Sequence, residues 1–160
     1  MNKAILLTAV LLANLTLMGA APLMTQKDLK FTWIKNNPNY VVTFTPEIAR
    51  AECKENQRQS LAIQADFNRP ILAGQSYVIT FRARGTTGVI SVQPQFNGKG
   101  SKNLLSDAEL FEDWKKYEVS FTAPADAKTF SCAIYSWNRL GHFEIRDFSV
   151  VLKEEKKEEK

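Results

Sequence analysis

The chain has 160 residues, of which 44% are hydrophobic, 24% are charged and 11% are aromatic. This composition is ordinary for one globular domain and excludes collagen-like, low-complexity and multi-span membrane proteins. The net charge is only +4, with charges of both signs mixed along the chain, so we expect no nucleic-acid partner.

The N-terminal segment has the three parts of a secretory signal peptide. Met1-Asn2-Lys3 gives a short positive start, residues 4–17 form an apolar run, and small residues follow. We predict a signal peptide over residues 1–20, with cleavage after Ala20 or Ala21. The mature protein is then expected to be secreted, periplasmic or extracellular, with no membrane partner. A retained anchor is the alternative, but the apolar run is short for a bilayer span.

From residue 28 to residue 152, apolar and polar residues alternate with a period of two far more often than they repeat at helical spacing. We therefore expect residues 21–152 to form an all-β domain, an antiparallel β-sandwich or jelly roll. Segments rich in glycine, proline and asparagine separate the expected strands. The strands are expected at residues 40–45, 59–67, 76–84, 89–96, 115–122, 129–137 and 142–152.

Three segments do not follow this alternation. Ser106 and Glu109 have the spacing of a capping box, which predicts a turn or two of helix before Trp114. Residues 46–55 fit a helix and a strand equally well. Residues 153–160 are Lys and Glu without an apolar side chain, so we expect a charged disordered tail.

The chain has two cysteines, Cys53 and Cys132. In an exported protein we predict that they form a disulfide, which closes a long loop and stabilises the fold by about 4–5 kcal/mol in the chain-entropy model. Two buried free thiols are the alternative, because Cys132 lies inside an expected strand. Together with the single histidine, His142, they do not make a zinc site.

Three motifs occur in a recognisable order. Residues 72–85 read LAGQSYVITFRARG, residues 114–124 read WKKYEVSFTAP, and residues 141–152 read GHFEIRDFSVVL. In that order and spacing they resemble the family 4/9 type of carbohydrate-binding modules. The resemblance implies a galactose-binding-like β-sandwich that binds glycans, does no chemistry and is usually attached to polysaccharide-degrading enzymes. It also implies that Asp147 helps to hold a structural calcium ion, although Arg146 stands where the family often has another Asp; no other cofactor is expected. The alternation of apolar residues changes phase at Asp147, so a plain hydrogen-bonded bulge is the alternative to a calcium site.

Strand parity separates core side chains from outward ones. If Tyr77 and Phe81 point into the core, the two arginines that follow Phe81 point outward. The flat aromatic rings would stack on the C–H face of a pyranose, and the amide and guanidinium groups would bind its hydroxyls. If these strands belong to one sheet, their outward side chains form a single ligand-binding face. The alternative is an ordinary solvated surface. The predicted ligand-binding residues are Trp137, Tyr135, Arg82, Arg84, Gln93 and Gln95.

An enzyme is the main competing class. A glycosidase needs two carboxylates placed across the scissile bond, and the nearby acids, Asp107/Glu109 and Glu112/Asp113, lie in a short polar segment without signs of burial. We therefore predict a non-catalytic protein that binds an oligo- or polysaccharide. A protein-interaction or envelope-structural β-sandwich without glycan binding is the alternative, because the domain is not fused to an enzyme in this sequence.

Overall fold

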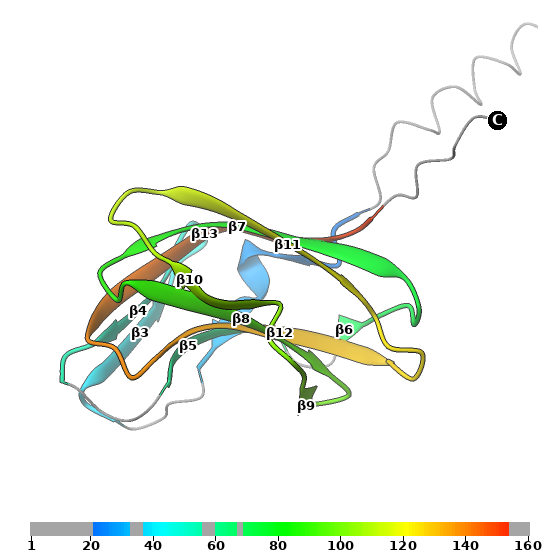
Figure 1. The fold of residues 1–160 in the computed structure, drawn as a ribbon, viewed down its shortest axis with the longest axis horizontal. Helices are drawn as coiled ribbons and strands as arrows, with labels where there is room; N and C mark the ends of the chain where they lie inside the picture. The colour runs from blue at the N-terminus through cyan, green and yellow to red at the C-terminus, as the bar shows by residue number, and fades with distance from the viewer. Residues whose placement is uncertain (1–20, 33–36, 56–59, 67–68, 154–160) are drawn as a thin grey trace, which may run out of the picture.

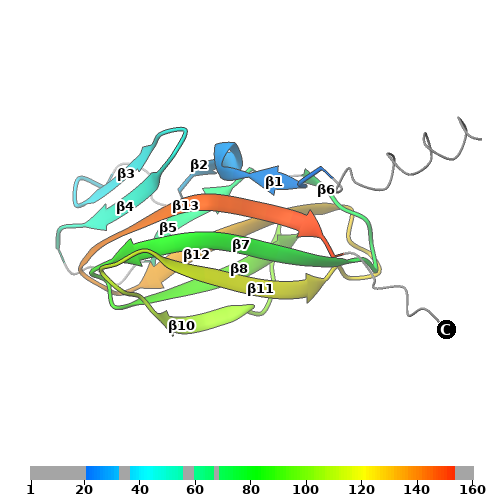
Figure 2. The same cartoon turned by 90° about the horizontal axis from the view of Figure 1, so that it is seen from above.

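The computed structural model describes residues 21–32, 37–55, 60–66 and 69–153. It is a sandwich of two antiparallel sheets, shown from the side in Figure 1 and facing one sheet in Figure 2. The all-β prediction is therefore confirmed. The predicted signal peptide and most of the charged tail lie outside the described residues. Within the described ranges, no helix is long and apolar enough to cross a membrane.

Sheet 1 has the strand order β11-β7-β13-β4-β3, and β1 pairs with β13 outside this path. The long central strands β7 and β13 lie side by side, with β11 at one edge, as Figure 2 shows. The strands in this order are β11 (Lys115–Thr122), β7 (Ser76–Gly85), β13 (Gly141–Leu152), β4 (Ala49–Cys53), β3 (Tyr40–Phe44) and β1 (Met24–Thr25).

Sheet 2 has the strand order β10-β8-β12-β5-β2, while β6 pairs with β12 and β9 pairs with β8. A single turn of 3-10 helix, η1 (Gln26–Asp28), joins β1 of sheet 1 to β2 of sheet 2. The strands are β10 (Leu105–Glu109), β8 (Val89–Phe96), β12 (Thr129–Trp137), β5 (Ser60–Ala65), β2 (Leu29–Phe31), β6 (Arg69–Pro70) and β9 (Lys99–Gly100).

The core lies between the two sheets and is built by alternate residues of each strand. The side chains of Tyr77 and Phe81 of β7 are buried, as strand parity predicts. Aromatic rings join the sheets, because Phe121 of sheet 1 stacks on Phe130 of sheet 2 with 4.9 Å between ring centroids. Phe96 of sheet 2 contacts Phe130 at 5.7 Å. This packing turns the intervening polar residues of each strand to the two outer faces.

The predicted helix near Ser106 is wrong, because residues 105–109 form the edge strand β10 against β8. Asp107 has a positive φ of 45°, and its backbone N–H donates a hydrogen bond to Ser91 Oγ at 2.9 Å. The open edge of β8 thus offers this segment hydrogen-bond partners that outweigh its capping-box spacing. The segment that fitted both alternatives, residues 46–55, contains the strand β4.

The predicted disulfide is also wrong, since both cysteines are buried free thiols. Cys53 lies on β4 of sheet 1, where its Sγ donates to the carbonyl oxygen of Glu55 at 2.9 Å. Cys132 lies on β12 of sheet 2, and burial raises the pKa of its thiol to about 12. The two thiols belong to different sheets and have different surroundings, so Cys132 acts as a small core residue that stays protonated at neutral pH.

Candidate functional site

The structure divides the six predicted ligand-binding residues between two opposite faces. Arg82 and Arg84 belong to β7 of sheet 1. The other four belong to β8 and β12, which are neighbours in sheet 2. The expectation of one shared face is therefore wrong. Parity along a strand predicts which side of its own sheet a residue occupies, but it does not predict which sheet the strand joins.

The outer face of sheet 2 carries a groove of about 510 Å³. Its floor comes from β8 and β12, which are in register with Ser91 opposite Tyr135 and Gln93 opposite Ala133. The segment from Asn103 to β10 and the loop after β12 complete it. The lining residues are Ser91, Gln93, Asn103, Ser106, Asp107, Tyr135, Trp137 and Arg139.

Tyr135 and Trp137 lie two residues apart on β12 and therefore face the same side of the sheet. Trp137 is 56% exposed, although it is one of the largest apolar side chains of the protein. Tyr135 is half-buried, and its hydroxyl accepts a hydrogen bond from Asn103 Nδ2 at 2.8 Å. The groove therefore combines one aromatic ring held by a neighbour with one that is open to solvent.

The two predicted glutamines have different environments. Gln93 lines the groove and is half-buried. Gln95 is only 8% exposed and lies outside the groove lining, and its Oε1 accepts a hydrogen bond from Gln64 Nε2 at 2.8 Å. The Gln64–Gln95 hydrogen bond therefore links β5 to β8 across the intervening strand β12, and the buried Gln95 is not placed to touch a ligand in the groove.

Sequence reasoning missed one wall of the groove. Asn103, Ser106 and Asp107 lie in or just before β10, which was expected to be helical. Residues 97–100 read NGKG, a typical turn sequence, and a hairpin there returns the chain beside β8. This turn was the local signal for the correct arrangement. Arg139, in the loop after β12, carried no signal of its own.

The sequence of residues 30–140 matches the profile of a family described as carbohydrate binding domain. The chain belongs to the family 4/9 carbohydrate binding domains. The resemblance that its motifs suggested is thereby confirmed. This carbohydrate binding domain matches no curated protein.

Solved structures share the fold of this carbohydrate binding domain at low sequence identity. BiXyn10A CBM1 in its apo form has a TM-score of 0.60 and 17% identity, covering 80% of this chain and 94% of that chain. The CBM22-1 xylan-binding domain of Paenibacillus barcinonensis Xyn10C has a TM-score of 0.54 and 10% identity, covering 84% and 96%. The N-terminal cellulose-binding domain of Cellulomonas fimi β-1,4-glucanase C has a TM-score of 0.53 and 16% identity, covering 71% and 84%.

The two predicted arginines lie on the outer face of sheet 1, where Arg84 is part of an ion-pair network. Glu144 Oε2 accepts from Arg84 Nε at 2.7 Å, and Glu144 Oε1 accepts from Arg50 Nη1 at 2.6 Å. Burial alone would raise the pKa of Glu144, but the hydrogen bonds from the two guanidiniums outweigh it and lower the pKa. Arg84 is thus occupied within the fold of this carbohydrate binding domain.

Asp147, the residue expected to help hold calcium, sits in a bulge of β13 with a φ of 55°. Its Oδ2 lies 3.6 Å from Arg146 Nε and 3.8 Å from Arg82 Nε. Calcium takes about six to eight oxygen ligands, yet the described residues contain no group of three or more His, Cys, Asp or Glu suited to a metal. One carboxylate between two guanidiniums does not fit a calcium ion.

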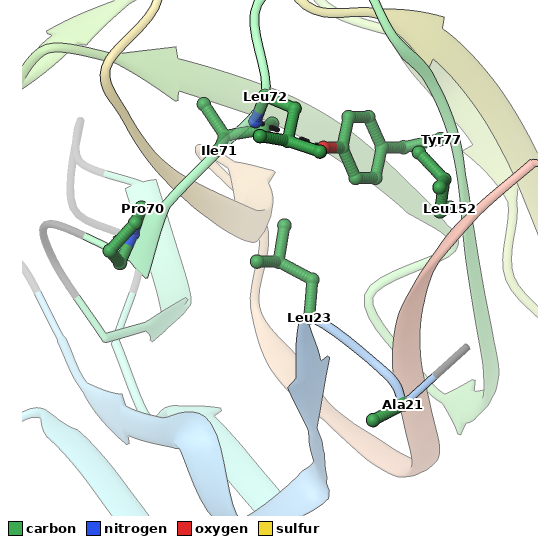
Figure 3. Close-up of a pocket in the computed structure, with 7 residues that line it drawn as sticks. All are labelled: Ala21, Leu23, Pro70, Ile71, Leu72, Tyr77 and Leu152. Carbon is green, nitrogen blue, oxygen red and sulfur yellow. Dashed lines mark hydrogen bonds between the residues drawn. The ribbon is translucent and has the colours of Figure 1, made fainter.

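A second cavity, of about 260 Å³, opens at one end of the sandwich (Figure 3). Its one hydrogen bond among the residues drawn runs from the Leu72 N–H to Tyr77 Oη at 3.1 Å. The surrounding side chains offer almost no polar groups for sugar hydroxyls, so this cavity does not suit a glycan chain. Its lining residues are Ala21, Leu23, Pro70, Ile71, Leu72, Tyr77 and Leu152.

Proposed function

We propose that this carbohydrate binding domain binds an oligo- or polysaccharide in the groove of sheet 2. The observation that carries the proposal is the pair of aromatic rings on β12, with Trp137 exposed beside the hydrogen-bonded Tyr135. A flat aromatic ring in this setting provides an apolar surface for the C–H face of a sugar ring. Tyr135 is already held in place by Asn103, which lowers the entropy that binding has to overcome.

The polar lining of the groove supports the same ligand class. Gln93 and Asn103 carry side-chain amides, which both donate and accept hydrogen bonds and so suit sugar hydroxyls. The lining contains one cation, Arg139, and one carboxylate, Asp107. The groove is therefore close to neutral, which favours an uncharged glycan.

We also propose that the domain does not cleave the glycan. Glycoside hydrolysis uses a pair of carboxyl groups, one on each side of the scissile bond. Among the described residues that line the groove, Asp107 alone carries a carboxylate, and its side chain is exposed. Mass spectrometry of the bound oligosaccharide after long incubation is expected to show intact ligand, and shorter products would contradict this part of the proposal.

The site is tested by a glycan array on the mature protein, followed by calorimetry with the selected oligosaccharide. Trp137→Ala removes the exposed ring and is expected to weaken binding by about 1–3 kcal/mol, the range for losing the burial of a large apolar side chain. The matched control is Phe111→Ala, because Phe111 is also an exposed aromatic, at 40%, but lies outside the groove. Equal affinities for the two variants would place the site elsewhere.

If the array selects no glycan at all, the protein-interaction or envelope-structural alternative becomes the better description. Trp137→Ala is expected to keep the stability of the wild type, since removing an exposed side chain leaves no core cavity. Thermal unfolding of both variants therefore separates a lost contact from a lost fold.

We propose that the protein is exported and processed after Ala20 or Ala21. The support is the order of charged, apolar and small residues at the start of the sequence. The intact mass of protein recovered from the periplasm or medium is expected to lack this segment. A full-length mass would contradict processing.

Alkylation without reductant is expected to modify both thiols once the chain is unfolded, as the structure has no disulfide.

A further inference from the structure

Three cations lie side by side in one row on the outer face of sheet 1. Lys116 of β11 is in register with Arg82 of β7, and Arg82 is in register with Arg146 of β13. Their side chains are 62%, 49% and 36% exposed, respectively. Like charges directly opposite one another destabilise a sheet. Folding alone therefore does not favour this arrangement, which we call the cation row.

The neighbouring row of the same sheet shows how such charges are normally balanced. There Glu144 of β13 lies between Arg84 of β7 and Arg50 of β4, so the charges alternate in sign. Both arginines donate hydrogen bonds to Glu144, at 2.7 and 2.6 Å. This second row has one carboxylate shared by two cations at bonding distance, and its charges are satisfied within the fold.

The carboxylates beside the cation row leave its two arginines incompletely paired. Glu118 Oε2 accepts a hydrogen bond from Lys116 Nζ at 2.9 Å. Asp147 lies 3.8 Å from Arg82 Nε and 3.6 Å from Arg146 Nε, distances that are too long for hydrogen bonds. Within the described chain, neither guanidinium thus donates a hydrogen bond to a carboxylate. Arg146 Nε is buried without a hydrogen-bond partner among the described residues, so an anion is met by the exposed parts of the two side chains, which are 49% exposed at Arg82 and 36% exposed at Arg146.

Trp114 orients one of these guanidiniums. The guanidinium of Arg146 lies over the indole ring at 4.3 Å from its centroid, and that of Arg84 lies at 4.8 Å. A guanidinium that stacks by its planar face keeps its N–H edge free for bidentate binding of a carboxylate or a similar oxyanion. The contact with Trp114 thus fixes the position of the Arg146 guanidinium on the outer face of sheet 1, where the side chain remains 36% exposed.

We propose that the cation row binds an acidic polysaccharide, one that carries carboxylate or sulfate groups on successive sugars. Adjacent strands are about 4.8 Å apart, so the row extends about 10 Å across three strands and matches repeated anionic groups better than a single anion. Because Trp114 is occupied by two guanidiniums, the site lacks the open aromatic platform that single-stranded nucleic acid uses. The row is on the sheet opposite the groove, so the two ligands bind independently.

The test measures binding of the mature protein to polygalacturonate and to dextran sulfate, at low and at physiological salt. The double variant Arg82→Gln/Arg146→Gln is expected to bind at least one of these polymers about tenfold more weakly, since each change removes a charge-assisted contact. The matched control is Lys102→Gln/Lys128→Gln, which removes the same charge from exposed lysines away from sheet 1. Equal losses in the two double variants would overturn the proposal.

Two further binding experiments identify the ligand class and the face that binds it. Polyglutamate is expected to bind more weakly than both polysaccharides. Equal binding would show that any polyanion suffices, which would overturn the assignment of a glycan ligand. Trp137→Ala is expected to retain acidic-polysaccharide binding, whereas its loss would move that ligand to the groove. The arginine double variant is expected to unfold within a few degrees of wild type, because the like-charge repulsion that is removed offsets the lost contacts with Trp114 and Asp147. Absence of binding to either polysaccharide would overturn this proposal and leave the groove proposal intact.

Discussion

The outer faces of the two sheets have the same backbone geometry but different chemistry. The face of sheet 1 carries long charged side chains, among which Glu144 binds two arginines within the fold. The face of sheet 2 carries aromatic, amide and hydroxyl groups around a groove, with Trp137 exposed. A side chain whose hydrogen bonds are satisfied inside the protein contributes stability, whereas an exposed apolar ring bordered by polar groups suits a ligand.

The largest stability effect is expected on the face of sheet 1. Glu144→Ala leaves Arg50 and Arg84 without their shared carboxylate and is expected to destabilise the fold by about 2–3 kcal/mol. This is less than for a fully buried pair, because the arginine side chains are 35% and 42% exposed and partly solvated. Urea unfolding measures the change. If Glu144→Ala lowered the unfolding free energy as little as Trp137→Ala does, the two faces would not differ in their contribution to stability.

The same carboxylate predicts how stability depends on pH. The pKa of Glu144 is lowered in the folded state from its ordinary value of 4.5. Its contribution is therefore complete above that value and is lost as the pH falls through the lower folded pKa. The free energies of unfolding of wild type and Glu144→Gln are expected to differ at neutral pH and to converge as the pH falls through this acid range. A difference in unfolding free energy that is the same at every pH would contradict the role of the ion pairs.

A smaller effect is expected below the groove of sheet 2. Gln64→Leu removes the donor to Gln95 Oε1 and leaves that buried oxygen without its partner. The expected cost is about 1 kcal/mol of unfolding free energy. Glycan affinity is expected to fall less than in Trp137→Ala, because Gln95 supports the groove without lining it. Calorimetry and urea unfolding measure the two quantities, and an affinity loss as large as that of Trp137→Ala would give Gln95 a direct role.

The smallest effect is expected for Tyr135→Phe. This change keeps the aromatic ring and removes only the hydroxyl that accepts a hydrogen bond from Asn103 at 2.8 Å. Stability is expected to fall by about 0.5 kcal/mol, since the bond is partly exposed to water. Glycan binding is expected to weaken slightly, through the freed Asn103 side chain. Binding that weakens as much as in Trp137→Ala would show that the hydroxyl contacts the ligand.

Much of the fold followed from local pattern. The expected strands at 89–96, 115–122 and 129–137 coincide with β8, β11 and β12. Alternation is a strong signal here because one face of each strand packs against a tight apolar core. The apolar alternation also changes phase near Asp147, between Ile145 and Phe148, and the structure has a bulge of β13 there. At Ser106, by contrast, the local capping spacing was overridden by pairing with β8, a contact that the local sequence does not contain.

The family, the all-β class, most strand positions and the core-facing side of each strand could be predicted from the amino-acid sequence. Each of these depends on the spacing of residues within one segment or on ordered motifs. Three features required the folded structure: Arg82 and Gln93 lie on opposite faces, Cys53 and Cys132 form no disulfide, and β10 forms a wall of the groove. These features depend on which strands become neighbours, and that choice is made by the packing of the whole core and by long connections between strands.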